Sequence, residues 1–153
     1  MSRYNHLIKA SLEGLFSGII LTFFLKVVEY LSDFKVYTLL LNVDYIPFVN
    51  QFYFPEIVEV SFHLIVSIVL SVCLSIFIDY LKIELPNKIL FFYTGVSFLI
   101  GLLLFPTTAL STRTPPITSI PSLTYWLVGH VFYGLILAIL YIKREKLPSK
   151  PDC

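Results

Sequence analysis

Four long apolar stretches constrain the fold of this chain more than any other feature of its sequence. They run over Ala10–Leu31, Ile57–Leu81, Ile89–Leu110 and Leu123–Ile142. As helices that rise about 1.5 Å per residue, they each reach roughly 30 Å, which is the thickness of the hydrocarbon core of a bilayer. They are too long for barrel strands and lack the alternation of such strands. The sequence therefore predicts an all-α polytopic membrane protein, a four-transmembrane-helix bundle that forms a single integral membrane domain over residues 1–153.

The composition supports the same class of protein. Hydrophobic residues make up 57% of the chain and charged residues 14%, whereas soluble domains average about 45–50% and about 25%. A small soluble domain has too much surface to hide so much apolar area, and a net charge of +1 creates no field for a polyanion. The composition excludes an ordinary soluble enzyme, a disordered chain and a nucleic-acid-binding domain. Its abundance of Phe, Tyr, Ile, Leu and Lys is typical of an AT-rich, bacterial coding sequence.

Basic residues give the predicted helices a direction. Eight of them fall on the side of the two tails and of the short second loop: Arg3, Lys9, Lys82, Lys88, Lys143, Arg144, Lys146 and Lys150. The opposite side has only Lys35 and Arg113. Because cytoplasmic loops are enriched in Lys and Arg, we expect both termini in the cytoplasm and the protein in a bacterial plasma (inner) membrane.

The two loops on the opposite, outer side differ in character. The first, Ser32–Glu56, is long and aromatic, with Tyr45, Phe48 and Tyr53 among its residues, and we expect it to lie at the interface or to fold over the bundle. The second, Ser111–Ser122, is rich in Ser, Thr and Pro and is predicted to be stiff and polar.

Residues near the helix ends add local expectations. Pro55, Pro86 and Pro121 are predicted to open helices, because proline fits the first helical turn. Ser122 is a candidate N-cap for the last helix, and Trp126, close to the same end, is expected to anchor the helix at the membrane interface.

Ionisable residues within the spans are the candidate functional residues, because charge is costly in a membrane. Glu13 and Asp79 lie close enough to the cytoplasmic ends of their helices to reach the interface. The others lie in the outer half, where His63 and His130 are expected at similar depth on different helices. The candidate binding site consists of Lys26, Glu29, Glu59, His63, His130 and Tyr133.

Three interpretations of this polar cluster remain open. In a structural one, Lys26 neutralises Glu29 or Glu59 and the histidines donate to backbone or hydroxyl oxygens. In a second, the cluster binds or passes a small solute or a proton, with Glu59 and His63 titrating. In a third, Glu59 and His63, spaced i,i+4 on one helix face, join His130 as metal ligands, or the two histidines hold a haem.

Small and hydroxyl residues recur at helical spacing in the same spans. Ser67, Ser71 and Ser75 continue the every-fourth-residue pattern of Glu59 and His63. Pairs four residues apart also occur on the first span, at Gly14 and Gly18, and on the third, at Ser97 and Gly101. Such residues are the usual contacts between membrane helices, so these positions are predicted to face inward.

The last span contains Gly129-His130-Val131-Phe132-Tyr133-Gly134-Leu135-Ile136-Leu137-Ala138, a GHxxYGxxLA pattern. It resembles the last helix of small, uncharacterised bacterial four-helix membrane proteins of the YagU and YqhR types. This resemblance implies an inner-membrane protein with an outer-half histidine on its last helix, and implies no activity.

These observations favour a non-enzymatic function, since the chain has no HExxH, GxSxG or Walker-type motif. We expect a multi-pass protein that binds or passes a small solute or proton at the outer cluster, or that is a subunit of a larger membrane assembly or homo-oligomer. The alternative is a membrane redox or metal protein that uses the paired histidines. No cofactor is expected, and the partners expected are the lipid bilayer and other membrane subunits, not nucleic acid.

Overall fold

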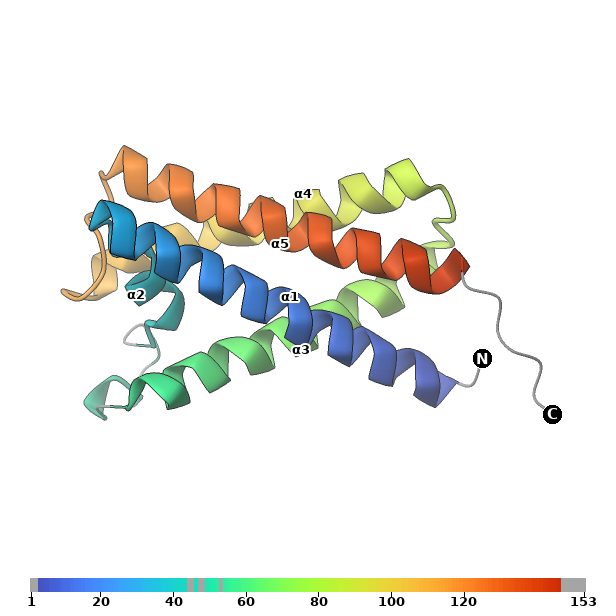
Figure 1. Cartoon of the computed structure of the whole chain (residues 1–153), viewed down its shortest axis with the longest axis horizontal. Coiled ribbons are helices and arrows are strands. Elements are labelled where there is room, and N and C mark those ends of the chain that lie inside the picture. Colours follow the sequence, from blue (N-terminus) through green and yellow to red (C-terminus); the bar gives the residue numbers. More distant parts are fainter. Residues whose placement is uncertain (1–2, 44–45, 47–48, 53, 147–153) are drawn as a thin grey trace.

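A computed structural model describes residues 3–43, 46, 49–52 and 54–146, and within these ranges every regular element is a helix. The elements in chain order are α1 (Arg3–Ser32), α2 (Val36–Leu41), η1 (Val49–Gln51), α3 (Glu56–Leu81), α4 (Pro86–Leu104), η2 (Phe105–Leu110) and α5 (Ile120–Lys146) (Figure 1). The prediction of an all-helical chain is thus confirmed for the residues described.

Four helices are long and apolar enough to cross a membrane: Tyr4–Ser32, Glu56–Leu81, Pro86–Leu110 and Ile120–Glu145. They contain the four predicted spans, and each extends beyond its prediction, the first and the last at both ends. Large apolar side chains such as Phe23, Val66 and Phe91 lie exposed along these helices, which is the arrangement of side chains that face lipid rather than water. The chain therefore has the helices of a multi-pass membrane protein.

The helix starts follow the proline signals, with one correction. Pro55 is the N-cap of α3, and Pro86 is the first residue of α4. The last helix begins at Ile120, earlier than predicted, so Ser122 lies within its first turn and is not its cap. Ser119 takes that role, because its carbonyl accepts the amide of Leu123 at 3.0 Å and its hydroxyl accepts the amide of Ser122 at 3.4 Å.

The four long helices form an open arrangement rather than a closed ring. Helix α1 packs against both α3 and α5, and α4 packs against α5. Among the described residues, α3 and α4 form no extensive contact, although the rings of Phe77 and Phe92 stack with centroids 5.8 Å apart near the turn that joins them. The side between α3 and α4 is therefore the least closed side of the protein.

Glycines allow the closest approaches between helices. A Cβ at Gly14 of α1 would lie 2.7 Å from Ser71 Cβ of α3. A Cβ at Gly134 of α5 would lie 2.8 Å from Thr94 Cα of α4. Because carbon atoms in contact are about 3.5–4.0 Å apart, neither position can carry a side chain without separating its two helices.

The short helix α2 distinguishes one end of the molecule from the other. It lies at the end where α1 finishes and α3 begins, which we call the α2 end; α1 begins and α5 finishes at the opposite, terminal end (Figure 1). Val36, Leu39 and Leu41 are buried, and α2 packs against α1, α3 and α5. This part of the long first loop therefore folds over the helices, which was one of the two arrangements expected for it. Tyr45, Phe48 and Tyr53 lie outside the described residues.

Candidate functional site

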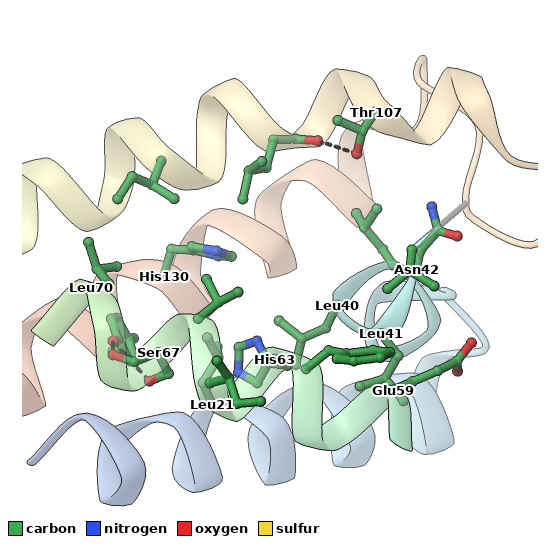
Figure 2. Close-up of a pocket in the computed structure, with 18 of the residues that line it drawn as sticks. Leu21, Leu40, Leu41, Asn42, Glu59, His63, Ser67, Leu70, Thr107 and His130 are labelled. Carbon is green, nitrogen blue, oxygen red and sulfur yellow. Dashed lines mark hydrogen bonds between the residues drawn. The ribbon is translucent and has the colours of Figure 1, made fainter. Parts of the chain in front are cut away.

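A cavity of about 310 Å³ lies beneath α2, between α3 and α4, with α5 forming its inner wall (Figure 2). Leucine, isoleucine and valine side chains make up much of the lining. The lining residues with polar side-chain atoms are Asn42, Glu59, His63, Ser67, Ser97, Thr107, Trp126, His130 and Tyr133. A largely apolar cavity of this size, with a few convergent polar groups, has the general form of a small-molecule site.

The structure divides the six candidate binding residues into two groups. Glu59, His63, His130 and Tyr133 all line the cavity. Lys26 and Glu29 are absent from the lining that the described residues form, and they contact α2 and the start of α3 instead. Within the described lining, the cavity therefore brings together ionisable residues of two helices only, Glu59 and His63 of α3 with His130 of α5, and Tyr133 of α5 lies beside them.

His130 presents a hydrogen-bond acceptor to the cavity. Its Nδ1 lies 2.9 Å from the carbonyl oxygen of Trp126, and a carbonyl can only accept, so in this hydrogen bond Nδ1 carries the proton. In the neutral ring Nε2 is then the acceptor. Figure 2 shows the ring directed from α5 into the space between α3 and α4. Gly101 of α4 makes room for it, since a Cβ there would lie 2.8 Å from His130 Cγ.

Trp126 differs from its prediction as an interface anchor. The side chain is buried, with 3% of its surface exposed, and its Nε1 donates to the carbonyl of Gly101 at 2.8 Å. Its ring centroid lies 4.3 Å from that of His130. The close packing of α4 on α5 at Gly101 brings the indole inside the protein, where it supports the histidine and lines the cavity.

His63 approaches the cavity from α3 and leaves a polar atom unsatisfied. Its ring lies beside the backbone carbonyl of Gly18. Among the described residues, however, its buried Nε2 has no hydrogen-bond partner of ordinary geometry, and neither does the buried Oγ of Ser97, which lies against Gly134 where α4 contacts α5. Buried polar groups are nearly always paired, but these two atoms are covered by protein, so they lie within the helix packing beside the cavity and not on its surface.

Tyr133 and the serines of α3 form an interhelical hydrogen-bond network. The Tyr133 hydroxyl donates to the carbonyl of Ser67 at 3.0 Å. The Oγ atoms of Ser67 and Ser71 donate across to α1, to the carbonyls of Gly14 at 2.7 Å and Ala10 at 2.8 Å. These serines therefore connect helices, which agrees with the prediction that the small and hydroxyl positions face inward.

The carboxylate of Glu59 is neutralised by an arginine that the sequence analysis did not include in the site. Arg113 Nη1 and Nη2 donate to its two oxygens at 2.9 and 3.1 Å. The Glu59 side chain is 5% exposed and that of Arg113 43% exposed, so the guanidinium extends from the surface to a buried carboxylate. A paired, bidentate carboxylate of this kind leaves little uncompensated charge at the cavity.

Lys26 and Glu29 form polar contacts around α2. Lys26 pairs with Glu56, so the interpretation in which it neutralises Glu29 or Glu59 is wrong. Lys26 Nζ lies 2.6 Å from Oε1 of Glu56, an atom to which the Tyr37 hydroxyl also donates at 2.6 Å. Burial, followed by the hydrogen bond to Glu56, raises the pKa of Tyr37 well above its usual range, so the phenol remains a donor. Glu29 accepts the amide and the hydroxyl of the same residue of α2, Thr38, each at 2.8 Å.

The proposed metal ligands do not assemble into a metal site. Within the described part of the chain, no group of three His, Cys, Asp or Glu side chains is placed to hold a metal ion. Glu59, His63 and His130 share the cavity, but the Glu59 oxygens bind Arg113. The expectation that these three residues form one ligand set is therefore corrected by their geometry.

A second polar cluster lies at the terminal end, and its pairing was not predicted from the sequence. Arg144, expected in the exposed basic belt, has only 4% of its side chain exposed and lies 3.2 Å from the Glu13 carboxylate. Its Nη2 donates to Ser75 Oγ at 2.8 Å. Nearby, the Tyr141 hydroxyl donates to Asp79 at 2.7 Å. Glu13 thus pairs inside the bundle instead of simply reaching the interface.

Comparison with known proteins gives no relative for this chain. It matches no family model, no curated protein and no solved structure. Function must therefore be argued from the site.

Proposed function

We propose that this chain is a multi-pass protein of a bacterial plasma membrane that binds a small solute in the cavity between α3 and α4. The basic residues near the terminal end favour a cytoplasmic location for that end and an outer location for α2. The observation that carries the proposal is the pair of histidines, His63 and His130, which reach one largely apolar cavity from different helices.

The polar groups of the lining support a binding role. The ring of His130 uses its Nδ1 proton for the Trp126 carbonyl, so Nε2 is an acceptor to which a hydroxyl-bearing solute in the cavity can donate. Because the Glu59 carboxylate is already compensated by Arg113, the cavity suits an uncharged solute better than an ion.

Trp126 offers a direct test, since it is the only tryptophan in the chain and it lines the cavity. The probe is 2,2,2-tribromoethanol, a small hydroxyl-bearing molecule whose bromines quench indole fluorescence. We expect saturable quenching of the purified protein, with a half-maximal concentration well below that of free tryptophan. Quenching that rises linearly with concentration would contradict the proposal.

Two neighbouring residues of α4 supply a matched pair of variants. Ile100 lines the cavity, whereas Leu99 is an exposed side chain outside the lining. Ile100→Phe fills part of the cavity and should weaken tribromoethanol binding at least several-fold, while Leu99→Phe should leave it unchanged. An equal effect of the two substitutions would place the bound probe elsewhere and contradict the proposal.

A further inference from the structure

We propose that the occupant of this cavity is a membrane-soluble amphiphile with one hydrocarbon chain and an uncharged, hydroxyl-bearing head, which enters from the lipid between α3 and α4. This inference rests on the binding function proposed above, and it adds the chemical class of the ligand and its route.

The route follows from which lining residues are exposed. Phe62, Ile65 and Val66 of α3 line the cavity and are also exposed on the surface of the protein. They lie within the span Glu56–Leu81, so in a bilayer this surface meets hydrocarbon. Because α3 and α4 form no extensive contact in the described structure, the cavity is least closed on this side.

The α2 end offers a poorer route. Residues of α2, Leu39 to Leu41, cover the cavity there, and Asn42 and Val43 continue the cover. The hydrogen bond of Tyr37 to Glu56 and the two hydrogen bonds of Glu29 to Thr38 hold this cover in place. A ligand that entered from water at this end would have to displace α2, whereas a lipid-like ligand could pass between α3 and α4.

The interior chemistry selects the head group. His130 presents Nε2 as an acceptor, because its Nδ1 proton is used by the Trp126 carbonyl. A hydroxyl can donate to that nitrogen and can also accept a hydrogen bond. Glu59 is the one charged side chain among the described lining residues, and Arg113 already compensates it. A carboxylate or phosphate head would therefore be buried without a counter-charge, at a large cost in free energy.

The volume and lining select the tail. A cavity of about 310 Å³ lies at the low end of the range of roughly 300–1,000 Å³ for small-molecule sites. It has room for one chain rather than for the two chains of a phospholipid. The apolar lining of Leu21, Ile65, Leu70 and Ile100 gives a hydrocarbon chain the contacts that it would otherwise make with lipid.

The experiment uses Trp126 as a reporter in lipid nanodiscs that contain the full chain. The probe is 9,10-dibromostearyl alcohol, and its control is methyl 9,10-dibromostearate, which has the same brominated chain but no hydroxyl proton. We expect the alcohol to quench saturably at low mole fraction and to bind about tenfold more tightly than the ester, a ratio that corresponds to about 1.4 kcal/mol. The double variant Trp126→Phe/Leu99→Trp has its tryptophan on the exposed face and gives the baseline for contact with bulk lipid.

Two further substitutions test the head group and the route. His130→Phe keeps a ring but removes the acceptor, so the preference for alcohol over ester should fall to about one. Val66→Phe should slow or weaken quenching, because Val66 lines the cavity and is 61% exposed. Val69→Phe is the matched control: Val69 is 55% exposed on the same helix but lies outside the described lining.

The outcomes separate this inference from the proposed function. Saturable quenching by tribromoethanol, together with alcohol quenching no greater than the bulk-lipid baseline, would overturn the amphiphile and leave solute binding standing. Failure of both probes would overturn both proposals. Equal binding of alcohol and ester would overturn the hydroxyl head, and equal effects of Val66→Phe and Val69→Phe would overturn the route. A stoichiometric dimer in the nanodisc whose interface covers Val66 would close this side of the cavity to lipid and would also overturn the route.

Discussion

Replacing Gly14 by alanine should destabilise the protein, because this glycine sets the distance between α1 and α3. A Cβ at this position would lie 2.7 Å from Ser71 Cβ, 2.8 Å from the carbonyl oxygen of Ser67 and 2.9 Å from Ile68 Cα. Two of these three atoms belong to the backbone, so no rotation of a side chain can remove the clash.

The size of the effect follows from these distances. Carbon atoms in contact are about 3.5–4.0 Å apart, so the helices must separate by roughly 0.8 Å at a cost typical of overpacking, about 1–3 kcal/mol. The same separation lengthens the hydrogen bonds from Ser67 and Ser71 to α1, now 2.7 and 2.8 Å. Such interhelical bonds average about 0.6 kcal/mol each, while alanine regains up to about 1 kcal/mol of helix propensity. The net expectation is a loss of about 1–3 kcal/mol.

Unfolding by sodium dodecyl sulfate in mixed micelles measures this loss, with far-UV circular dichroism and Trp126 fluorescence as independent probes. Gly95→Ala is the matched control, because a Cβ at Gly95 meets no atom within 4 Å, and it should be neutral or stabilise by up to about 1 kcal/mol. If Gly14→Ala stays within about 0.5 kcal/mol of the parent, as an uninvolved surface substitution would, the argument that Gly14 sets the helix spacing is refuted.

Three further substitutions probe the ionic contacts. Arg113→Gln removes the guanidinium from the buried Glu59 carboxylate, so the same titration should show a loss of about 1–3 kcal/mol, and adding Glu59→Gln should restore most of it. Arg144→Lys should also destabilise, because a single ammonium cannot replace the guanidinium that reaches both Glu13 and α3; parental stability would contradict a structural role for this cluster. Glu29→Gln weakens two hydrogen bonds to α2, so amide hydrogen exchange in α2 should quicken about tenfold, or by about 1.4 kcal/mol, with α4 unchanged.

The helices were predictable because their signals are local. A run of apolar residues as long as a bilayer is thick has few alternatives to a helix, and prolines 55 and 86 mark the starts of α3 and α4 as expected. The start of α5 was missed because Ser119 and Ser122 are equivalent as capping residues in the sequence. Only the course of the preceding loop decides between them.

The site was predictable to the extent that it depends on helix periodicity. Glu59 and His63 lie one turn apart, and counting residues placed His130 at a similar depth, so these residues share the cavity. The partners of the long charged side chains were not predictable. Lys26 binds Glu56 and Arg113 binds Glu59 because the loops between helices place those groups together, and helix spacing contains no information about loops.

The order of helix packing has a mechanical consequence. Gly14 ties α1 to α3 and Gly134 ties α5 to α4, which makes two tightly joined halves. Within the described structure the halves meet along α1 and α5, through α2, and through the turn at Lys82, whose φ of 52° reverses the chain after α3. Hydrogen bonds from α5 to α3, such as that of Tyr133 to Ser67, also join them. The cavity lies at the seam opposite the α1–α5 contact. A change in the angle between the halves would therefore alter the width of the cavity while leaving the α1–α3 and α4–α5 contacts intact.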